Sequence, residues 1–158
     1  MPRYVIDEAA LRRNLAILKG VATRTGAKIL LAQKAFSCAA VYPLCARYLA
    51  GTTASSLFEA RHGHDNFGGE THVFAPAFIP EEMDELLELV DHIVFNSPRQ
   101  VSLYGEMARA RGVSTGFSMS TYSNLYLIRH ERNVFNMLVV TDFVRSMCKN
   151  PFCVMGLS

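Results

Sequence analysis

A lysine at the end of an apolar run is the residue whose neighbours in sequence most directly suggest a catalytic role. The run Lys28–Gln33 predicts a short buried strand, and Lys34 follows it directly. Apolar neighbours disfavour the charged form of a lysine, which is what a lysine that forms Schiff bases requires. The alternative is a strand-end lysine whose ammonium group extends to water along its apolar stem, and physical chemistry alone favours that alternative.

Two pairs of polar residues follow other predicted strands. Ser56 and Glu59 have the Ser-x-x-Glu spacing of a capping box, in which the serine hydroxyl and the glutamate carboxylate satisfy backbone N–H groups of a new helix. Asn96 and Ser97 directly precede Pro98, a residue that suits the first helical turn. Capping of the next helix is therefore the stronger interpretation of Asn96 and Ser97.

Histidine and cysteine spacing gives little support for a metal site or for disulfides. His62 and His64 with Asp65 could form a metal-binding pair, but no third ligand has matching spacing, so no metal is predicted. The remaining histidines are expected to be isolated: His72, His92 and His130. Without a secretory context the four cysteines are expected to be reduced thiols: Cys38, Cys45, Cys148 and Cys153.

Strand-like and helix-like segments alternate up to about residue 116. The predicted strands are Lys28–Gln33, Gly51–Ser55, Thr71–Ala75, His92–Phe95 and Val113–Phe117. The predicted helices are Asp7–Arg24, Ala39–Ala50, Leu57–Phe67, Pro80–Val90 and Pro98–Arg111. This alternation predicts an α/β fold with parallel strands. The strands are short and no Gly-x-Gly-x-x-Gly follows them, which favours a (β/α) barrel over a doubly wound sheet.

The chain is shorter than a complete barrel. A (β/α)8 barrel takes about 250 residues, whereas the sequence has 158. We therefore expect a partial TIM-type barrel of the first four to five βα units in residues 1–116. Residues 117–158 are expected to form an irregular, unrelated tail, because the alternation stops and only Glu131 and Asp142 are acidic there.

Composition excludes several classes of protein. Hydrophobic residues make up 50% and charged residues 19%, which is typical of a folded domain rather than a disordered chain. The net charge of +2 and the lack of a Lys/Arg-rich run predict no nucleic-acid partner. No apolar stretch approaches the roughly 20 residues of a membrane span, and Asp7 and Glu8 interrupt the region of a secretory signal. We expect a cytoplasmic protein with no membrane association.

Four segments together resemble one enzyme family. They are Ile29–Phe36, Gly51–Ala60, His72–Ala77 and Asp91–Ser97. In the same order and spacing, from Tyr4 to about Gly116, they resemble carboxynorspermidine (carboxyspermidine) decarboxylases. These belong to the alanine racemase / ornithine decarboxylase-type group of pyridoxal 5'-phosphate (PLP) enzymes. The resemblance covers roughly the first third of such an enzyme.

The resemblance implies a role for individual residues. Lys34 matches the lysine that bonds covalently to PLP, and Ser56 and Glu59 match polar positions that face the cofactor pocket. Thr53 stands where related decarboxylases commonly have an acidic residue. The implied reaction is decarboxylation of a carboxylated polyamine, carboxynorspermidine or carboxyspermidine, to norspermidine or spermidine. The implied assembly is a homodimer.

The resemblance fails beyond about Gly116. The run Gly116–Ser120 lacks the arginine of the family's next strand, and the later histidine, the glycine-rich phosphate loop, the acidic partner of the pyridine nitrogen and the C-terminal β domain have no match. We therefore expect a truncated relative that is inactive as written. A frameshift near residues 113–120 and a natural short protein with a diverged tail both explain the change. The alternative function is a non-catalytic barrel fragment that binds PLP loosely or associates with an intact decarboxylase subunit.

Overall fold

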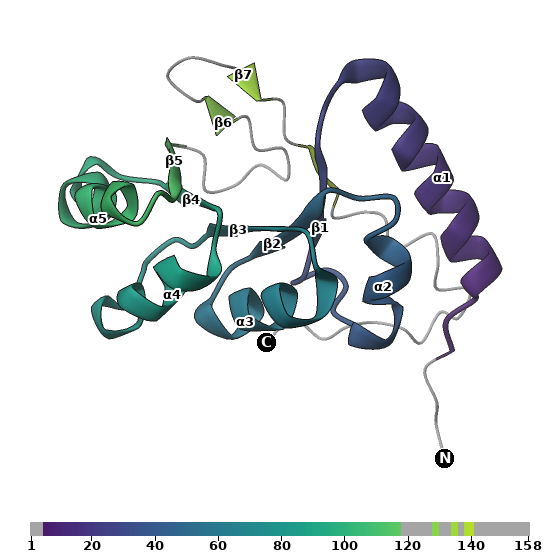
Figure 1. Cartoon of the computed structure of the whole chain (residues 1–158), viewed down its shortest axis with the longest axis horizontal. Coiled ribbons are helices and arrows are strands. Elements are labelled where there is room, and N and C mark those ends of the chain that lie inside the picture. Colours follow the sequence, from purple (N-terminus) through teal and green to yellow (C-terminus); the bar gives the residue numbers. More distant parts are fainter. Residues whose placement is uncertain (1–4, 118–127, 130–133, 136–137, 141–158) are drawn as a thin grey trace.

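A computed structural model of the chain describes residues 5–117, 128–129, 134–135 and 138–140. Its main feature is a parallel sheet whose strands pair in chain order from β1 to β5 (Figure 1). These strands are β1 (Ile29–Ala32), β2 (Gly51–Ala54), β3 (Glu70–Phe74), β4 (His92–Phe95) and β5 (Ser114–Phe117). Each strand pairs in parallel with the next, as predicted. The predicted α/β class with a run of βα units is therefore confirmed.

The helices that precede or connect the strands lie along one side of the sheet (Figure 1). They are α1 (Glu8–Thr25), α2 (Tyr42–Cys45), α3 (Leu57–Phe67), α4 (Met83–Leu89) and α5 (Pro98–Ala110), with 3-10 turns at η1 (Ala39–Val41) and η2 (Pro80–Glu82). Successive βα units with helices on one side of a parallel sheet form the arrangement expected of a partial (β/α) barrel.

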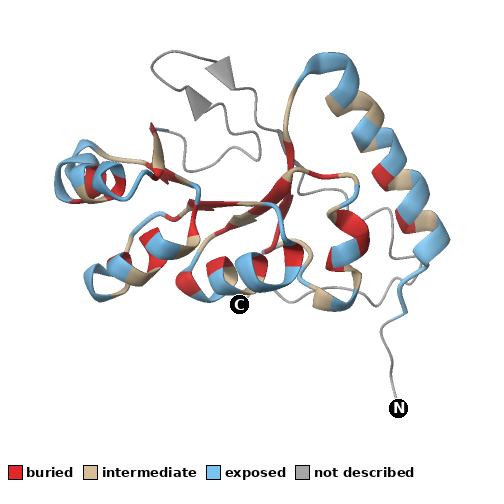
Figure 2. Ribbon diagram, viewed as in Figure 1, coloured by how far each residue is buried: buried red, intermediate tan, exposed pale blue. Residues whose placement is uncertain are grey.

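Alternate residues along each strand point to opposite sides of the sheet, and the two sides differ in character. On the helix-facing side, Ala54, Val73 and Ile93 are buried against α3, α4 and α5 (Figure 2). The strand register then places the alternate residues on the opposite side, which we call the inner face. Its polar members are Thr53, Glu70, His72, His92 and Ser114. The core on the helix-facing side is apolar, whereas the inner face carries most of the polar residues of the sheet.

Caps fix the ends of the longer helices where the sequence places them. The Asp7 carboxylate accepts a hydrogen bond from the Ala10 N–H at 2.9 Å, at the start of α1. Gly26 ends that helix with a φ of 71°, a left-handed conformation that glycine adopts without strain. Helix α3 runs over Leu57–Phe67, the range that the sequence predicts.

The predicted helix over Ala39–Ala50 is wrong in extent. A 3-10 turn leads into a single turn of α-helix, Tyr42–Cys45, and turns follow as far as residue 50. Pro43 explains the difference, because it has no N–H to bond to the carbonyl of residue 39 and is tolerated only in a first helical turn. The apolar spacing of this segment therefore reflects burial of Tyr42 and Cys45 rather than a long helix.

One glycine lets a helix approach the sheet closely. Gly63 is buried in α3, and a Cβ atom at this position would lie 2.3 Å from Thr52 Oγ1 and 2.7 Å from Gln33 Nε2. These separations are shorter than any van der Waals contact. The backbone of α3 can pack against β2 only because position 63 has no side chain.

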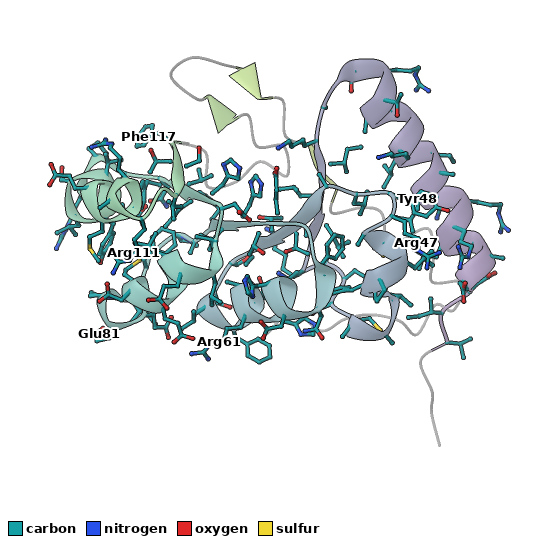
Figure 3. All side chains as sticks on the ribbon, in the orientation of Figure 1. Arg47, Tyr48, Arg61, Glu81, Arg111 and Phe117 are labelled. Atoms are coloured by element: carbon teal, nitrogen blue, oxygen red, sulfur yellow. The ribbon has the colours of Figure 1, made fainter. Side chains whose placement is uncertain are left out.

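Ion pairs join neighbouring helices at the surface. Arg61 of α3 pairs with Glu85 of α4, and Arg111 pairs with Asp84 of α4. The two arginines are labelled in Figure 3. Hydrogen bonding to Glu85 raises the pKa of Arg61, and the same contact lowers the pKa of Glu85. Pairs exposed to solvent in this way add little to stability, so the apolar core carries the packing of α4.

The described residues of the tail form three short strands. Strand β8 (Leu138–Val140) pairs in parallel with β1 and extends the sheet to the order β5-β4-β3-β2-β1-β8. Strands β6 (Ile128–Arg129) and β7 (Val134–Phe135) form a separate antiparallel pair. The domain boundary predicted at residues 116–117 stays a prediction.

Cys38 and Cys45 are free thiols, as expected. Burial raises the pKa of the Cys45 thiol to about 11, so it behaves as a small apolar residue. Cys148 and Cys153 lie outside the described residues, as does His130. Within the described residues, no helix combines the length and apolar character needed to cross a membrane.

Candidate active site at the carboxyl edge of the sheet

Lys34 lies in the turn that follows β1, at the carboxyl edge of the parallel strands. The turn is closed by hydrogen bonds from the Ala35 and Phe36 N–H groups to the Ala32 carbonyl, at 3.0 and 3.1 Å. The side chain of Lys34 is exposed, so the desolvation considered from its apolar neighbours is not found. An exposed side chain agrees with the alternative interpretation of a strand-end lysine.

A buried glutamine connects this turn to helix α3. Gln33 is only 1% exposed, and its Nε2 donates a hydrogen bond of 2.7 Å to the Glu59 carbonyl. Its Oε1 accepts a hydrogen bond of 3.3 Å from the hydroxyl of buried Tyr42. Because both polar ends of Gln33 are held, the turn that carries Lys34 has a fixed position relative to the first turn of α3. The sequence gives no signal for this role beyond a polar residue inside an apolar run.

The capping role of Ser56 and Glu59 is confirmed. Ser56 Oγ accepts a hydrogen bond from the Glu59 N–H at 3.2 Å, and Glu59 Oε2 accepts one from the Ser55 N–H at 2.6 Å. Ser56 is exposed and Glu59 is half-buried. A serine that accepts a bond in this way still has its own O–H to donate. Capping therefore leaves Ser56 able to bind a ligand, as the second role predicted for it requires.

The end of β4 repeats the same arrangement with different residues. Ser97 Oγ accepts a hydrogen bond from the Gln100 N–H at 3.2 Å, and Gln100 Oε1 accepts one from the Asn96 N–H at 2.9 Å. Gln100 Nε2 and Asn96 Nδ2 both donate to the Pro76 carbonyl at 3.1 Å, which links the ends of β3 and β4. The predicted capping role of Ser97 is confirmed, and Asn96 acts mainly as a link between loops.

The residues at this edge fit an anionic cofactor such as PLP, which the resemblance implies. Helices α3 and α5 both begin directly after strand ends, so the positive ends of their dipoles lie toward this edge. Lys34 directly follows Gln33, whose side chain donates a hydrogen bond to the Glu59 carbonyl in the first turn of α3. Thr53 is the last inner-face residue of β2 and pairs in register with Ala32 and His72. Lys34, Ser56 and Glu59 could therefore contribute to one site.

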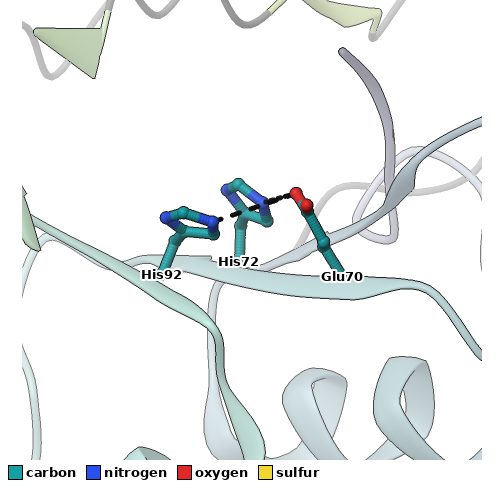
Figure 4. A group of neighbouring side chains, drawn as sticks. All are labelled: Glu70, His72 and His92. Atoms are coloured by element: carbon teal, nitrogen blue, oxygen red, sulfur yellow. Dashed lines mark hydrogen bonds and ion pairs between the residues drawn. The ribbon is translucent and has the colours of Figure 1, made fainter. Parts of the chain in front are cut away.

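Two histidines expected to be isolated are in contact on the inner face. The rings of His72 and His92 stack with centroids 4.1 Å apart, and Glu70 lies beside them (Figure 4). The expectation was wrong because strand pairing, which the sequence does not show, sets these residues opposite each other. His62 and His64 form no such group in the described part of the chain: His62 contacts the Tyr42 ring, and His64 pairs with exposed Asp65.

The comparisons with known proteins agree with the resemblance. The chain is 46% identical over 107 residues to a carboxynorspermidine/carboxyspermidine decarboxylase of Herminiimonas arsenicoxydans, a match that covers 68% of the chain and 29% of that protein. It is 35% identical over 119 residues to a carboxyaminopropylagmatine decarboxylase of Synechocystis sp., covering 75% of the chain and 31% of that protein. No model of a protein family matches the sequence.

A solved structure gives the same answer for the fold. The crystal structure of carboxynorspermidine decarboxylase from Campylobacter jejuni, complexed with norspermidine, superposes with a TM-score of 0.67 and 32% sequence identity. The chain is a partial relative of the carboxynorspermidine decarboxylases. The superposition covers 78% of this chain and 34% of the C. jejuni decarboxylase. Against the curated decarboxylases the chain spans 29% and 31% of their length.

Proposed function

We propose that this chain forms the part of a PLP-dependent carboxy-lyase that carries the cofactor-binding lysine. The enzyme acts on carboxynorspermidine or carboxyspermidine in polyamine biosynthesis. The observation that carries the proposal is the position of Lys34. It lies in a segment that resembles these decarboxylases, at the carboxyl edge of a parallel sheet, where barrel enzymes place their active sites. The 46% identity to the Herminiimonas decarboxylase supports the substrate class. The cytoplasm is the proposed compartment.

The proposed roles follow from what each side chain has available. The exposed amine of Lys34 bonds covalently to the cofactor, and the free O–H of Ser56 donates a hydrogen bond to it. Glu59 holds the Ser55 backbone and so fixes the loop on which Ser56 lies. When PLP is bound, its ring supplies the electron sink that accepts the electron pair left as carbon dioxide departs. The proposed assembly is a homodimer.

The proposal for Lys34 is tested by trapping the cofactor. The purified chain is incubated with PLP, reduced with borohydride, digested and mapped by mass spectrometry. We expect the label on the peptide that contains Lys34, and we expect Lys34→Arg to remove it. Lys19→Arg is the matched control, because Lys19 is an exposed lysine on α1, away from the carboxyl edge. Equal labelling of Lys19 and Lys34 in the unmodified chain contradicts the role of Lys34.

We propose further that these 158 residues by themselves do not decarboxylate the substrate. The sequence after Gly116 lacks the arginine of the next family strand, and the family's acidic partner of the pyridine nitrogen has no match in it. PLP bound at Lys34 would then lack an acid to keep its ring nitrogen protonated. We expect carbon dioxide release from carboxyspermidine at the rate of free PLP in buffer. Enzyme-like turnover by the purified chain contradicts this, whereas label at Lys34 without turnover supports a non-catalytic PLP-binding fragment.

A further inference from the structure

A group of three metal-ligating side chains lies on the inner face, away from the Lys34 turn. Glu70 and His72 are two residues apart on β3, so both point to the same side of the sheet. His92 on β4 is the register partner of His72 and points to that side as well. The alternation of strand residues and the parallel register together bring these three residues into one cluster (Figure 4).

The separations within this cluster are those of a coordination sphere. Glu70 Oε2 lies 3.1 Å from His72 Nε2 and 3.9 Å from His92 Nε2. Zinc bonds to nitrogen and oxygen of about 2.0–2.2 Å in tetrahedral geometry place neighbouring ligand atoms about 3.4 Å apart. The two observed distances lie on either side of that value. One ligand atom from each of the three residues falls within 4.8 Å of the others.

The charges of the cluster suit a divalent cation. Glu70 brings a carboxylate oxygen within 3.1 Å of His72 Nε2 and 3.9 Å of His92 Nε2. A neutral imidazole and a carboxylate are the forms in which these side chains bind metals.

The second oxygen of Glu70 already has a partner. Lys28 Nζ forms an ion pair with Glu70 Oε1, while Oε2 lies beside the histidines. Oε2 of Glu70 can thus coordinate a metal while Oε1 stays paired with Lys28. Contacts of this kind, one step removed from the metal, orient metal ligands. The ammonium group of Lys28 also offsets the charge of the carboxylate.

We propose that Glu70, His72 and His92 form a binding site for a zinc-class divalent cation, with a water molecule in the fourth position, that joins β3 to β4. Glu70 and His92 are the first residues of their strands, whereas Lys34 follows the end of β1. The cation site therefore lies toward the amino-terminal ends of the strands, the end of a barrel associated with stability rather than catalysis. Its role is structural, and its occupancy is independent of PLP.

The test measures zinc binding to the full chain by calorimetry and by competition with a zinc-sensitive dye. We expect one ion per chain, an increase in Tm on adding zinc, and a visible absorption band of tetrahedral type when Co²⁺ is used instead. His92→Gln and Glu70→Gln are expected to weaken zinc binding at least about 100-fold, because even outer-shell changes cost 10- to 100-fold. The matched controls are His62→Gln and His64→Gln, which leave the affinity unchanged.

Two results overturn the proposal. One is a full chain that binds no zinc below millimolar concentration and shows no Co²⁺ band. The other is a loss of affinity in the His62 or His64 control equal to that in His92→Gln. Because the His92 side chain is 33% exposed, its replacement is the variant least liable to unfold the chain. The Co²⁺ spectrum is measured on the unmodified chain, so it tests the cation site even if a replacement unfolds the protein.

Discussion

Replacing Gly63 by alanine is expected to lower the free energy of unfolding by about 3 kcal/mol, at the upper end of the usual cost of overpacking a core. The new Cβ would lie 2.3 Å from Thr52 Oγ1, and the neighbouring Gln33 Nε2 is already committed to the Glu59 carbonyl. Helix α3 must therefore move away from β2 or the Gln33 contact must break. Denaturant unfolding monitored by circular dichroism measures the change.

The matched control for this prediction is Gly20→Ala in α1. The nearest heavy atom to a Cβ at position 20 is a guanidinium nitrogen of Arg24 at 3.5 Å, an ordinary contact. Alanine is favoured over glycine inside a helix by about 0.8–1.0 kcal/mol, so this variant should gain stability. A Gly63→Ala variant as stable as Gly20→Ala would show that α3 does not pack on β2 as described. Combining Gly63→Ala with Thr52→Ala should recover part of the loss.

Replacing Tyr42 by alanine is expected to cost about 3–5 kcal/mol, the range for removing a buried aromatic ring. Tyr42 is fully buried and packs edge-on against Phe67 at a centroid distance of 5.5 Å. Its hydroxyl donates to Gln33, so the change removes both core packing and a support of the Lys34 turn. Thermal and denaturant unfolding give the stability, and the PLP-trapping assay reports on Lys34.

Tyr42→Phe separates these two contributions. It keeps the ring against Phe67 and leaves Gln33 Oε1 without its donor, which should cost about 1–3 kcal/mol for an unsatisfied buried acceptor. PLP attachment to Lys34 should slow in Tyr42→Phe if Gln33 fixes the turn. If Tyr42→Phe is as stable as the unmodified chain and is labelled at the same rate, the Gln33 link has no positioning role.

Much of the fold could be predicted because local signals agree with it. Serine at an N-cap and glycine after a C-terminus mark the ends of α3, and apolar runs between helices mark the strands. The segment Ala39–Ala50 shows where spacing misleads, since apolar residues at helical intervals also occur where turns bury them. Pro43 was the available signal that the helix could not extend through this segment.

The candidate site was less predictable because it depends on pairing between distant segments. Lys34, Ser56 and Glu59 follow from a resemblance, but the hydrogen bond that links them, from Gln33 to the Glu59 carbonyl, spans 26 residues. Contact between His72 and His92 likewise needs the register of β3 against β4. Residue types alone leave such side chains looking isolated, and only the assembled sheet gives them neighbours.

The pairing of each strand from β1 to β5 with the next one in the chain bears on how the protein is made. Contacts between neighbours in sequence close short loops, which lowers the entropy lost before favourable contacts form. Each βα unit can dock as soon as it leaves the ribosome, on the unit completed before it. The Lys34 turn belongs to the first of these units, so the residue on which the proposed chemistry depends would be in place early in synthesis.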